Sequence, residues 1–202
     1  PWEDDAAYTF GAVAPYEVTP LFKFDCATKK YNSIDENGVI GPVTLNQTNI
    51  DYMVATPVER DSDISKSKIS FTFNHILSKL TFKFVAEDIN NETGIESYTI
   101  TKMHIENIQP TNTFTDNQWA VQATGTPYTI VSDVREDNSI ILSSASTHAT
   151  MAEEFLVIPQ QINYDNSSAG QSLSVNVLMD VVITYTDPSI PQLNVTGARA
   201  HF

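Results

Sequence analysis

Apolar and polar residues alternate along much of this chain with the two-residue period of a β-strand. The alternation is clear over residues 8–14, 69–73, 80–84, 98–105, 173–177 and 181–185. Successive side chains of a strand point to opposite faces, so each segment predicts a strand with one face toward a core. Residues 155–158 are instead continuously apolar and end at Pro159, which predicts a strand buried on both faces.

The alternation changes phase between Ile100 and Met103, because these two apolar positions are three residues apart rather than two. An extra residue on one strand of a pair, a β-bulge, has this effect on the side chains that follow it. We therefore predict a bulge near Thr101 and Lys102.

Turn-forming residues separate the predicted strands. They lie at residues 35–38, 90–94 and 165–170. Strands with turns between them are typical of an all-β sandwich or barrel. Residues 27–50 and 109–150 have weaker patterns, and loops of that length are unusual, so we expect further strands there. Residues 146–155 could hold at most one helical turn. The expected fold is all-β, with long loops and little helix, in a single domain over residues 1–202.

The composition excludes several classes of function. The chain has 11 basic and 25 acidic side chains and a net charge of −14, which disfavours binding to the phosphates of a nucleic acid. It has no run of about 20 apolar residues, so no membrane-spanning helix is expected. Cys26 is the single cysteine, which excludes an intrachain disulfide. We expect Cys26 to be a small buried apolar residue rather than a nucleophile.

The residue types that carry chemistry show no recognised spacing. The four histidines are His75, His104, His148 and His201, and no two of them have the spacing of a zinc site. The chain also lacks a Gly-x-Ser-x-Gly elbow, a glycine-rich phosphate loop and a complete calcium loop. We predict no catalytic residue, no metal ligand and no cofactor. A carboxylate pair that meets only in the fold stays an open alternative.

Aromatic residues could form a platform for a sugar ring. The candidates are Trp2, Trp119, Tyr128 and Tyr164. Nothing in the sequence places these four on one face, and most large aromatic side chains of a β domain belong to its core. We expect them to be core residues.

Three segments together resemble the fimbrillin family of Bacteroides-type pili. In that family an Asp-aromatic/Leu-Met/Leu-x-Ala motif precedes a strand that ends in Phe-x-His-x-Leu-Ser-Lys. This chain has Asp51-Tyr52-Met53-Val54-Ala55, then Phe73-Asn74-His75-Ile76-Leu77-Ser78-Lys79, later Trp119 after a turn, and a strand closed by Pro159-Gln160. The residues that carry the resemblance are Asp51, Tyr52, Phe71, Phe73, His75, Leu77, Ser78, Lys79, Leu80, Phe82, Trp119, Pro159 and Gln160.

The resemblance implies a transthyretin-like β-sandwich of Greek-key type and no catalytic residues. It implies an extracellular lipoprotein of the bacterial cell surface, in a pilus associated with the outer membrane. A sandwich that lacks one strand exposes an unpaired edge and an apolar groove, which an extended segment of a neighbouring subunit can fill. Head-to-tail donation of this kind does not close and produces a fibre. We expect this chain to be such an acceptor, as a structural or adhesive pilus component.

A second interpretation is a surface-lipoprotein module that does not polymerise and binds carbohydrate or host matrix. Exposed aromatic side chains on a concave face would favour that module, whereas an apolar groove along a sheet edge would favour the pilus subunit. The chain lacks the lipobox cysteine at its start and the Trp-x-x-Gly-x-x-Tyr-x-Tyr strand that often ends the family's domain. We therefore expect the N-terminal domain of a processed or truncated protein.

The motif residues are expected to hold the fold rather than to perform chemistry. We predict that Ile69, Phe71 and Phe73 alternate into a core on one strand, and that Leu80, Phe82 and Phe84 do so on the next. His75, Ser78 and Lys79 then lie at the junction of the two strands.

Overall fold

A computed structural model describes residues 6–17, 20–46, 50–61, 68–89, 93–121, 123–132, 140–150, 154–160 and 176–201. All regular elements in these ranges are β-strands, which confirms the predicted all-β class. The chain forms two compact units. Unit 1 comprises Pro1–Ser78, Pro110–Gly125 and Leu156–Gln161, and unit 2 comprises Lys79–Gln109, Thr126–Phe155 and Ile162–Phe202. A single domain over residues 1–202 and the transthyretin-like Greek-key type stay predictions.

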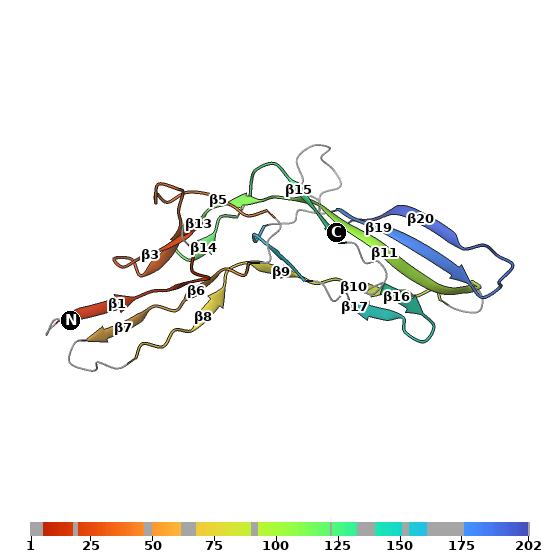
Figure 1. Cartoon of the computed structure of the whole chain (residues 1–202), viewed down its shortest axis with the longest axis horizontal. Helices are drawn as coiled ribbons and strands as arrows, with labels where there is room; N and C mark the ends of the chain where they lie inside the picture. Colours follow the sequence, from red (N-terminus) through yellow and green to blue (C-terminus); the bar gives the residue numbers. More distant parts are fainter. Residues whose placement is uncertain are drawn as a thin grey trace. The chain divides into compact units, whose positions relative to one another are not determined.

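Unit 1 consists of short antiparallel strands (Figure 1). Its strands are β1 (Ala7–Phe10), β2 (Val13–Ala14), β3 (Phe22–Asp25), β4 (Lys30–Ser33), β5 (Val43–Thr44), β6 (Met53–Ala55), β7 (Val58–Asp61), β8 (Phe73–His75), β12 (Thr111–Asn112), β13 (Phe114–Thr115) and β14 (Gln118–Trp119). The strands form the ladders β1-β7, β2-β6-β8, β3-β4, β5-β12 and β13-β14. The longest of these strands has four residues, so the packing of side chains between ladders must hold the unit together.

An aromatic cluster forms the core of unit 1. The ring of Phe22 lies 5.4 Å from that of Tyr52, 5.8 Å from that of Phe114 and 6.1 Å from that of Trp119. Phe22, Tyr52 and Phe114 are buried, and Trp119 is half-buried against them. Tyr31 is also buried, and its hydroxyl accepts a hydrogen bond from the Ala12 amide at 2.9 Å. The polar atom of this buried ring is therefore satisfied, as burial requires.

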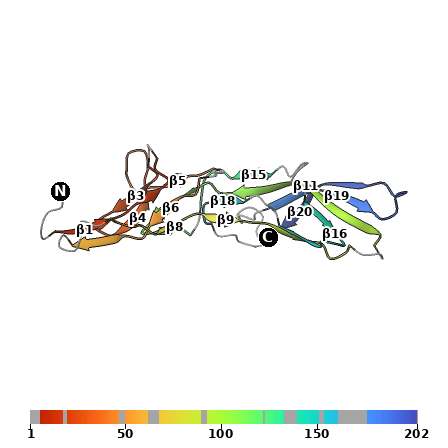
Figure 2. The same ribbon diagram turned by 60° about the horizontal axis from the view of Figure 1, so that its bottom comes forward.

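Unit 2 has longer strands that run side by side (Figures 1 and 2). Its strands are β10 (Lys83–Val85), β11 (Ile95–Ile108), β15 (Tyr128–Ser132), β16 (Ile140–Ser143), β17 (His148–Thr150), β19 (Asn176–Tyr185) and β20 (Leu193–His201). The main sheet has the order β15-β11-β19-β20, with β16 also pairing with β11, and β10 pairs with β17. Two further strands, β9 (Ser78–Leu80) and β18 (Phe155–Val157), contain the points where the chain passes from one unit to the other.

The weakly patterned segments contain strands, as predicted. Strands β4 and β5 fall within residues 27–50, and β12 to β17 fall within residues 109–150. The segment 146–155, where one helical turn was possible, instead contains β17 in its described part. Residues 173–175 of the predicted strand at 173–177 lie outside the described residues. The apolar run at 155–158 contains the predicted strand, β18, but Phe155 and Val157 are buried whereas Leu156 on the opposite face is half-buried, so burial on both faces is not complete.

Candidate functional site

The predicted bulge in β11 sets the facing of the main sheet of unit 2. The register of β11 against β19 shifts between Ile100 and Lys102, which confirms the prediction. Ile100 is buried before the shift, and Met103 and Ile105 are buried after it. The extra residue therefore keeps one face of β11 apolar from Tyr98 to Ile105. We call this the apolar face of the sheet.

The neighbouring strands continue the apolar face on both sides of β11. On one side, Ile105 pairs with Ile130 of β15 and Ile100 pairs with Ile140 of β16. On the other side, Ile100 pairs with Val181 of β19. Directly opposed residues of a pair lie on the same face, so all these side chains share it.

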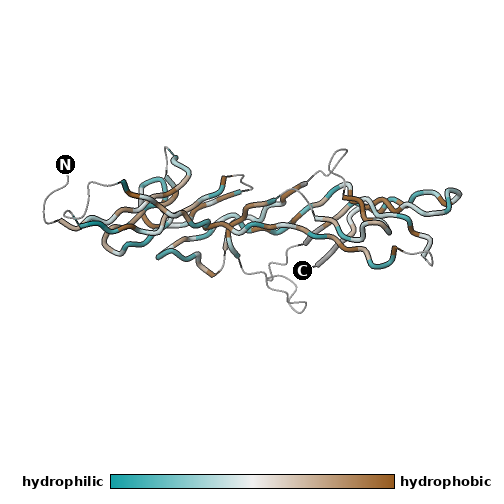
Figure 3. The backbone as a smooth tube through the Cα atoms, turned by 90° about the horizontal axis from the view of Figure 1, so that it is seen from below, coloured by the Kyte–Doolittle hydropathy of each residue, from teal (hydrophilic) through white to brown (hydrophobic). Residues whose placement is uncertain are grey.

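Burial on this face is greater on β11 and β15 than on β19 and β20. Ile105 on β11 and Ile130 on β15 have an exposed fraction of 0%. Met179, Val181 and Ile183 on β19 are half-buried, and Val195 on β20 is half-buried too. Leu193 on β20, which pairs with Ile183, is 49% exposed. Figure 3 shows hydrophobic positions along these strands.

Side chains of a second segment pack on the apolar face beside β16. Ala86 and Ile89 pack on Leu142 of β16, together with Phe84 and Tyr98. The Tyr98 hydroxyl donates a hydrogen bond to the Asp88 carboxylate at 2.6 Å. Burial of the ring and, to a smaller extent, the nearby Asp88 carboxylate raise the pKa of Tyr98 to about 12. These contacts involve the β16 side of β11.

Strand β20 is the edge of the main sheet in the part of the chain that the structure describes. Its ladder with β19 shifts register between Met179 and Val181, where Gly197 has a φ of 66° and donates its amide to the Asp180 carboxylate at 2.9 Å. Glycine adopts this left-handed conformation without steric cost, as a bulge of this type requires. The sequence reasoning missed β20. The alternation of Leu193 and Val195 with polar neighbours was the available signal.

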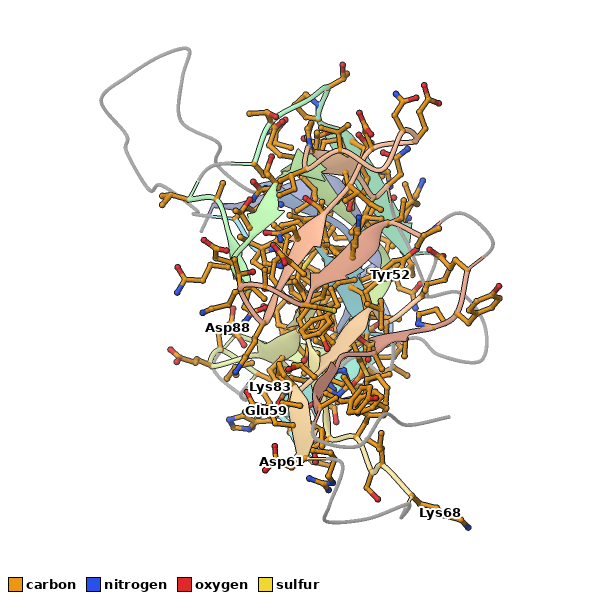
Figure 4. All side chains as sticks on the ribbon, turned by 90° about the vertical axis from the view of Figure 1, so that its left-hand side faces the viewer. Tyr52, Glu59, Asp61, Lys68, Lys83 and Asp88 are labelled. Atoms are coloured by element: carbon orange, nitrogen blue, oxygen red, sulfur yellow. The ribbon has the colours of Figure 1, made fainter. Side chains whose placement is uncertain are left out.

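Asp51 and His75 of the family motif form a pair in unit 1. The Nδ1 atom of His75 lies 2.5 Å from Oδ2 of Asp51, and both side chains are substantially exposed. His75 ends β8 and pairs with Met53 of β6, which brings the two residues together. Tyr52 points the other way, into the aromatic core. In Figure 4 Glu59, Asp61 and Lys68 lie below Tyr52.

The predicted core position is wrong for Phe73, which is exposed, and stays a prediction for Phe71 and Phe82. Phe73 is 37% exposed, and Phe71 and Phe82 are half-buried. Phe71 and Phe73 pack on each other with ring centroids 6.3 Å apart. Phe73 is exposed because it lies on β8, which is an edge strand of its three-stranded sheet in the described residues. Alternation predicts which side of a strand is apolar, but not whether another layer covers it.

The remaining motif residues make structural contacts. Leu77 packs on the core of unit 1, and Ser78, Lys79 and Leu80 form β9. The Lys79 ammonium lies 2.8 Å from the Glu154 carboxylate, in an exposed ion pair of the kind that contributes little stability.

Trp119, Pro159 and Gln160 each take part in a hydrogen bond whose acceptor is a backbone carbonyl. The Trp119 indole N–H donates to the Ile76 carbonyl at 2.5 Å. The Pro159 carbonyl accepts from Asn112 at 3.4 Å, and the Gln160 amide donates to the Ile158 carbonyl at 3.1 Å. That the motif as a whole holds the fold rather than performing chemistry stays a prediction.

The structure corrects the prediction for Cys26. This residue is exposed and lies in the turn between β3 and β4, so it is not a small buried apolar residue. Among the described residues, no three His, Cys, Asp or Glu side chains gather as metal ligands would. Trp119 and Tyr128 belong to different units, and Trp2 and Tyr164 lie outside the described residues. Burial raises the pKa of Tyr128 to about 12.

No helix within the described ranges is long and apolar enough to cross a membrane. Among curated protein sequences, none is significantly similar to this chain.

Two solved structures resemble this one. A fimbrial protein from Bacteroides vulgatus ATCC 8482 has a TM-score of 0.64 and 14% sequence identity, over 95% of this chain and 66% of its own length. A candidate cell adhesion protein from Bacteroides uniformis ATCC 8492 has a TM-score of 0.35 and 19% identity, over 93% of this chain and 58% of its own length. This chain thus spans less than two thirds of either protein, and the first likeness supports the fold.

The family assignment comes from the sequence itself. The sequence profile of the fimbrillin-like family matches residues 2–194, which is nearly the whole chain. The chain therefore belongs to the fimbrillin-like family.

Proposed function

We propose that this chain is a structural or adhesive component of a bacterial surface pilus, and that it accepts an extended strand from a neighbouring subunit along β20. The observation that carries the proposal is the decline in burial across one sheet face. In register, Ile100 of β11 is 4% exposed, whereas Val181 of β19 and Val195 of β20 are half-buried, and Leu193 at the start of the edge strand is 49% exposed. Family membership and the fimbrial structure of similar fold support a role at the cell surface.

An open edge next to a partly exposed apolar face suits strand addition. Strand β20 has nine residues, and along its outer side its amides and carbonyls make no ladder within the described residues. Such an edge is a template for another strand, and natural proteins normally shorten it or place charges on it. An added strand would form backbone hydrogen bonds and place alternate side chains on the apolar face.

The bulge at Gly197 divides the edge into two segments. Leu193 and Val195 precede it, and Ala198 follows it on the apolar face. An incoming strand with apolar residues at every second position could pair with the first segment and cover its half-exposed side chains. One face of one subunit would then contact a different segment of the next, which is a heterologous contact that continues into a fibre. The lipid anchor and the association with the outer membrane belong to the same proposal.

Two lysine variants test the proposal: one places a charge on the apolar face of β20, and the control places it on the opposite face. Val195→Lys introduces an ammonium among the half-exposed apolar side chains, whereas Asn194→Lys, one residue away, points to the other side of β20. We expect the native surface fraction to give an SDS-resistant ladder on an unboiled gel, detected with an antibody to this chain. Val195→Lys should abolish the ladder, because burying an unpaired charge is costly. Asn194→Lys should leave it intact.

Both variants should keep the melting temperature of the isolated chain within a few degrees, because residue 194 is exposed and residue 195 is half-buried. A single monomer band from intact surface material of the unchanged protein would contradict polymerisation. It would favour a surface module that does not polymerise. A ladder that persists in Val195→Lys would show that assembly uses another surface.

A further inference from the structure

Unit 1 contains a small pocket that the proposed assembly surface does not use. Its volume is about 230 Å³, and it lies beside the loop that follows β2. The buried rings of Phe22 and Tyr52 line it, with centroids 5.4 Å apart. Tyr16 also lines it and is 92% exposed. The pocket thus combines a fixed aromatic floor with an aromatic side chain that is open to solvent.

One charged group lines the pocket. The half-buried Glu17 carboxylate accepts a hydrogen bond from the Tyr52 hydroxyl at 2.8 Å through its Oε1 atom. Burial and this carboxylate raise the pKa of Tyr52 well above its usual range, so the hydroxyl stays protonated and keeps donating. Within the described residues, Oε2 of Glu17 has no hydrogen-bond donor. A bound hydroxyl or amine could supply one.

Size and charge restrict what the pocket could bind. Pockets for drug-sized molecules are roughly 300–1,000 Å³, so this one suits a single ring rather than an extended ligand. Its described lining contains no basic side chain, and the whole chain has a net charge of −14. A carboxylate in the ligand would therefore be repelled by Glu17 and find no counter-ion.

We propose that this pocket binds a neutral or amino hexopyranose residue at the end of a glycan. The apolar C–H face of the sugar packs on the Tyr16 ring, and a hydroxyl or amino group at its edge donates to Glu17. A purely apolar peptide side chain fits less well, because it would desolvate the Glu17 carboxylate without giving it a hydrogen bond. Sialic and uronic acids are excluded by charge.

The proposal is independent of strand addition. It rests on residues of unit 1 alone, whereas the assembly surface lies on β20 of unit 2. It also differs from the aromatic platform considered in the sequence, because none of Trp2, Trp119, Tyr128 and Tyr164 lines this pocket. Sequence patterns could not reveal it, since Glu17 and Tyr52 are 35 positions apart.

Saturation-transfer difference NMR on the 202-residue chain tests the site directly. The probes are the methyl glycosides of galactose, mannose, glucosamine and N-acetylglucosamine, with sialyllactose as the anionic comparison. We expect saturation of the ring protons of at least one neutral or amino sugar. Tyr16→Ala should weaken that binding about tenfold, because it removes the stacking ring. Glu17→Gln, which keeps an acceptor for Tyr52, should weaken it about threefold to tenfold.

Two variants on the same unit serve as controls. Val39→Ala removes an exposed apolar side chain, and Glu36→Gln removes an exposed charge, and neither residue lines the pocket. Both should bind the sugar as the unchanged chain does. Absence of saturation for every neutral and amino sugar would overturn the proposal, and so would unchanged binding in Tyr16→Ala. Binding of sialyllactose through its sialic acid, or of a proline-rich peptide while all the sugars stay inert, would also overturn it.

Discussion

Unit 1 gathers its large aromatic side chains into one enclosed cluster, whereas unit 2 spreads its apolar side chains along one face of a long sheet. In unit 1, Phe22 and Phe114 come from different ladders and are both buried. In unit 2, the same sheet face is fully buried at Ile105 and half open at Leu193. A closed cluster serves stability. A half-covered face leaves apolar area whose burial on assembly would be favourable.

The largest expected effect is in the enclosed cluster. Phe114 is 2% exposed, and its ring packs on those of Phe22 and Trp119. Phe114→Ala should lower the free energy of unfolding by about 3–5 kcal/mol, from lost transfer energy and a residual cavity. Urea unfolding followed by tryptophan fluorescence measures it, because Trp119 contacts the removed ring.

Phe73→Ala is the matched control for this comparison. The ring is 37% exposed on the edge strand β8, so we expect a loss of about 1 kcal/mol. Equal losses of unfolding free energy for Phe114→Ala and Phe73→Ala would show that the aromatic cluster contributes no more stability than the edge strand. The contrast between enclosed and open apolar surface would then fail for unit 1.

The next effect compares two positions on the apolar face of unit 2. Ile105→Ala removes a side chain with 0% exposure and should lower the free energy of unfolding by about 2–5 kcal/mol. Leu193→Ala removes a side chain that is half open and should cost about 1 kcal/mol in the isolated chain. Hydrogen exchange of the β11 amides reports the loss in this unit.

The effect on assembly should distinguish Ile105→Ala from Leu193→Ala in the opposite sense. If a neighbouring strand covers β20, Leu193→Ala should weaken the SDS-resistant ladder although it barely changes the isolated chain. Ile105→Ala should do the reverse, with a large effect on the isolated chain and a small one on the assembly contact. A Leu193→Ala variant that assembles as strongly as the unchanged protein would remove Leu193 from the contact.

Sequence alone predicted the all-β class and one fine detail of strand geometry. The phase change between Ile100 and Met103 is a local signal, and the bulge lies where that signal placed it. The burial of Phe73 was wrong because alternation marks the apolar side of a strand without showing which layer covers it. The exposure of Cys26 was missed because its turn joins β3 and β4, and the sequence patterns predicted the position of neither strand.

Long-range features were beyond the reach of the sequence. The half-open face depends on the order of β11, β19 and β20 in the sheet, which no local pattern encodes. The Glu17–Tyr52 hydrogen bond depends on packing between distant segments. The candidate surfaces therefore come from topology, while the family and the strand content come from the sequence.

The smallest effect concerns the turn that joins β19 to β20. Asp187 accepts hydrogen bonds from the Ser189 hydroxyl at 2.7 Å and the Ser189 amide at 2.8 Å. These bonds lower the pKa of the Asp187 carboxyl below its ordinary value of 3.8. Because the folded pKa is the lower one, the contribution to stability is present above pH 4 or so and is lost as the pH falls through the folded pKa. Carboxyl NMR titration measures it.

The effect of Ser189→Ala on the pKa of Asp187 shows whether the β19-β20 turn is formed or frayed in solution. It removes the hydroxyl donor, the larger cause of the shift, and should bring the pKa of Asp187 part of the way back. Asp25, in the β3-β4 turn of unit 1, is the matched control, since its lowered pKa depends mainly on the amides of Ala27 and Thr28 and should not move. An Asp187 that already titrates at its ordinary value would mean that the turn is open in solution. The exposure of Leu193 would then reflect fraying, and not a formed edge that awaits a partner strand.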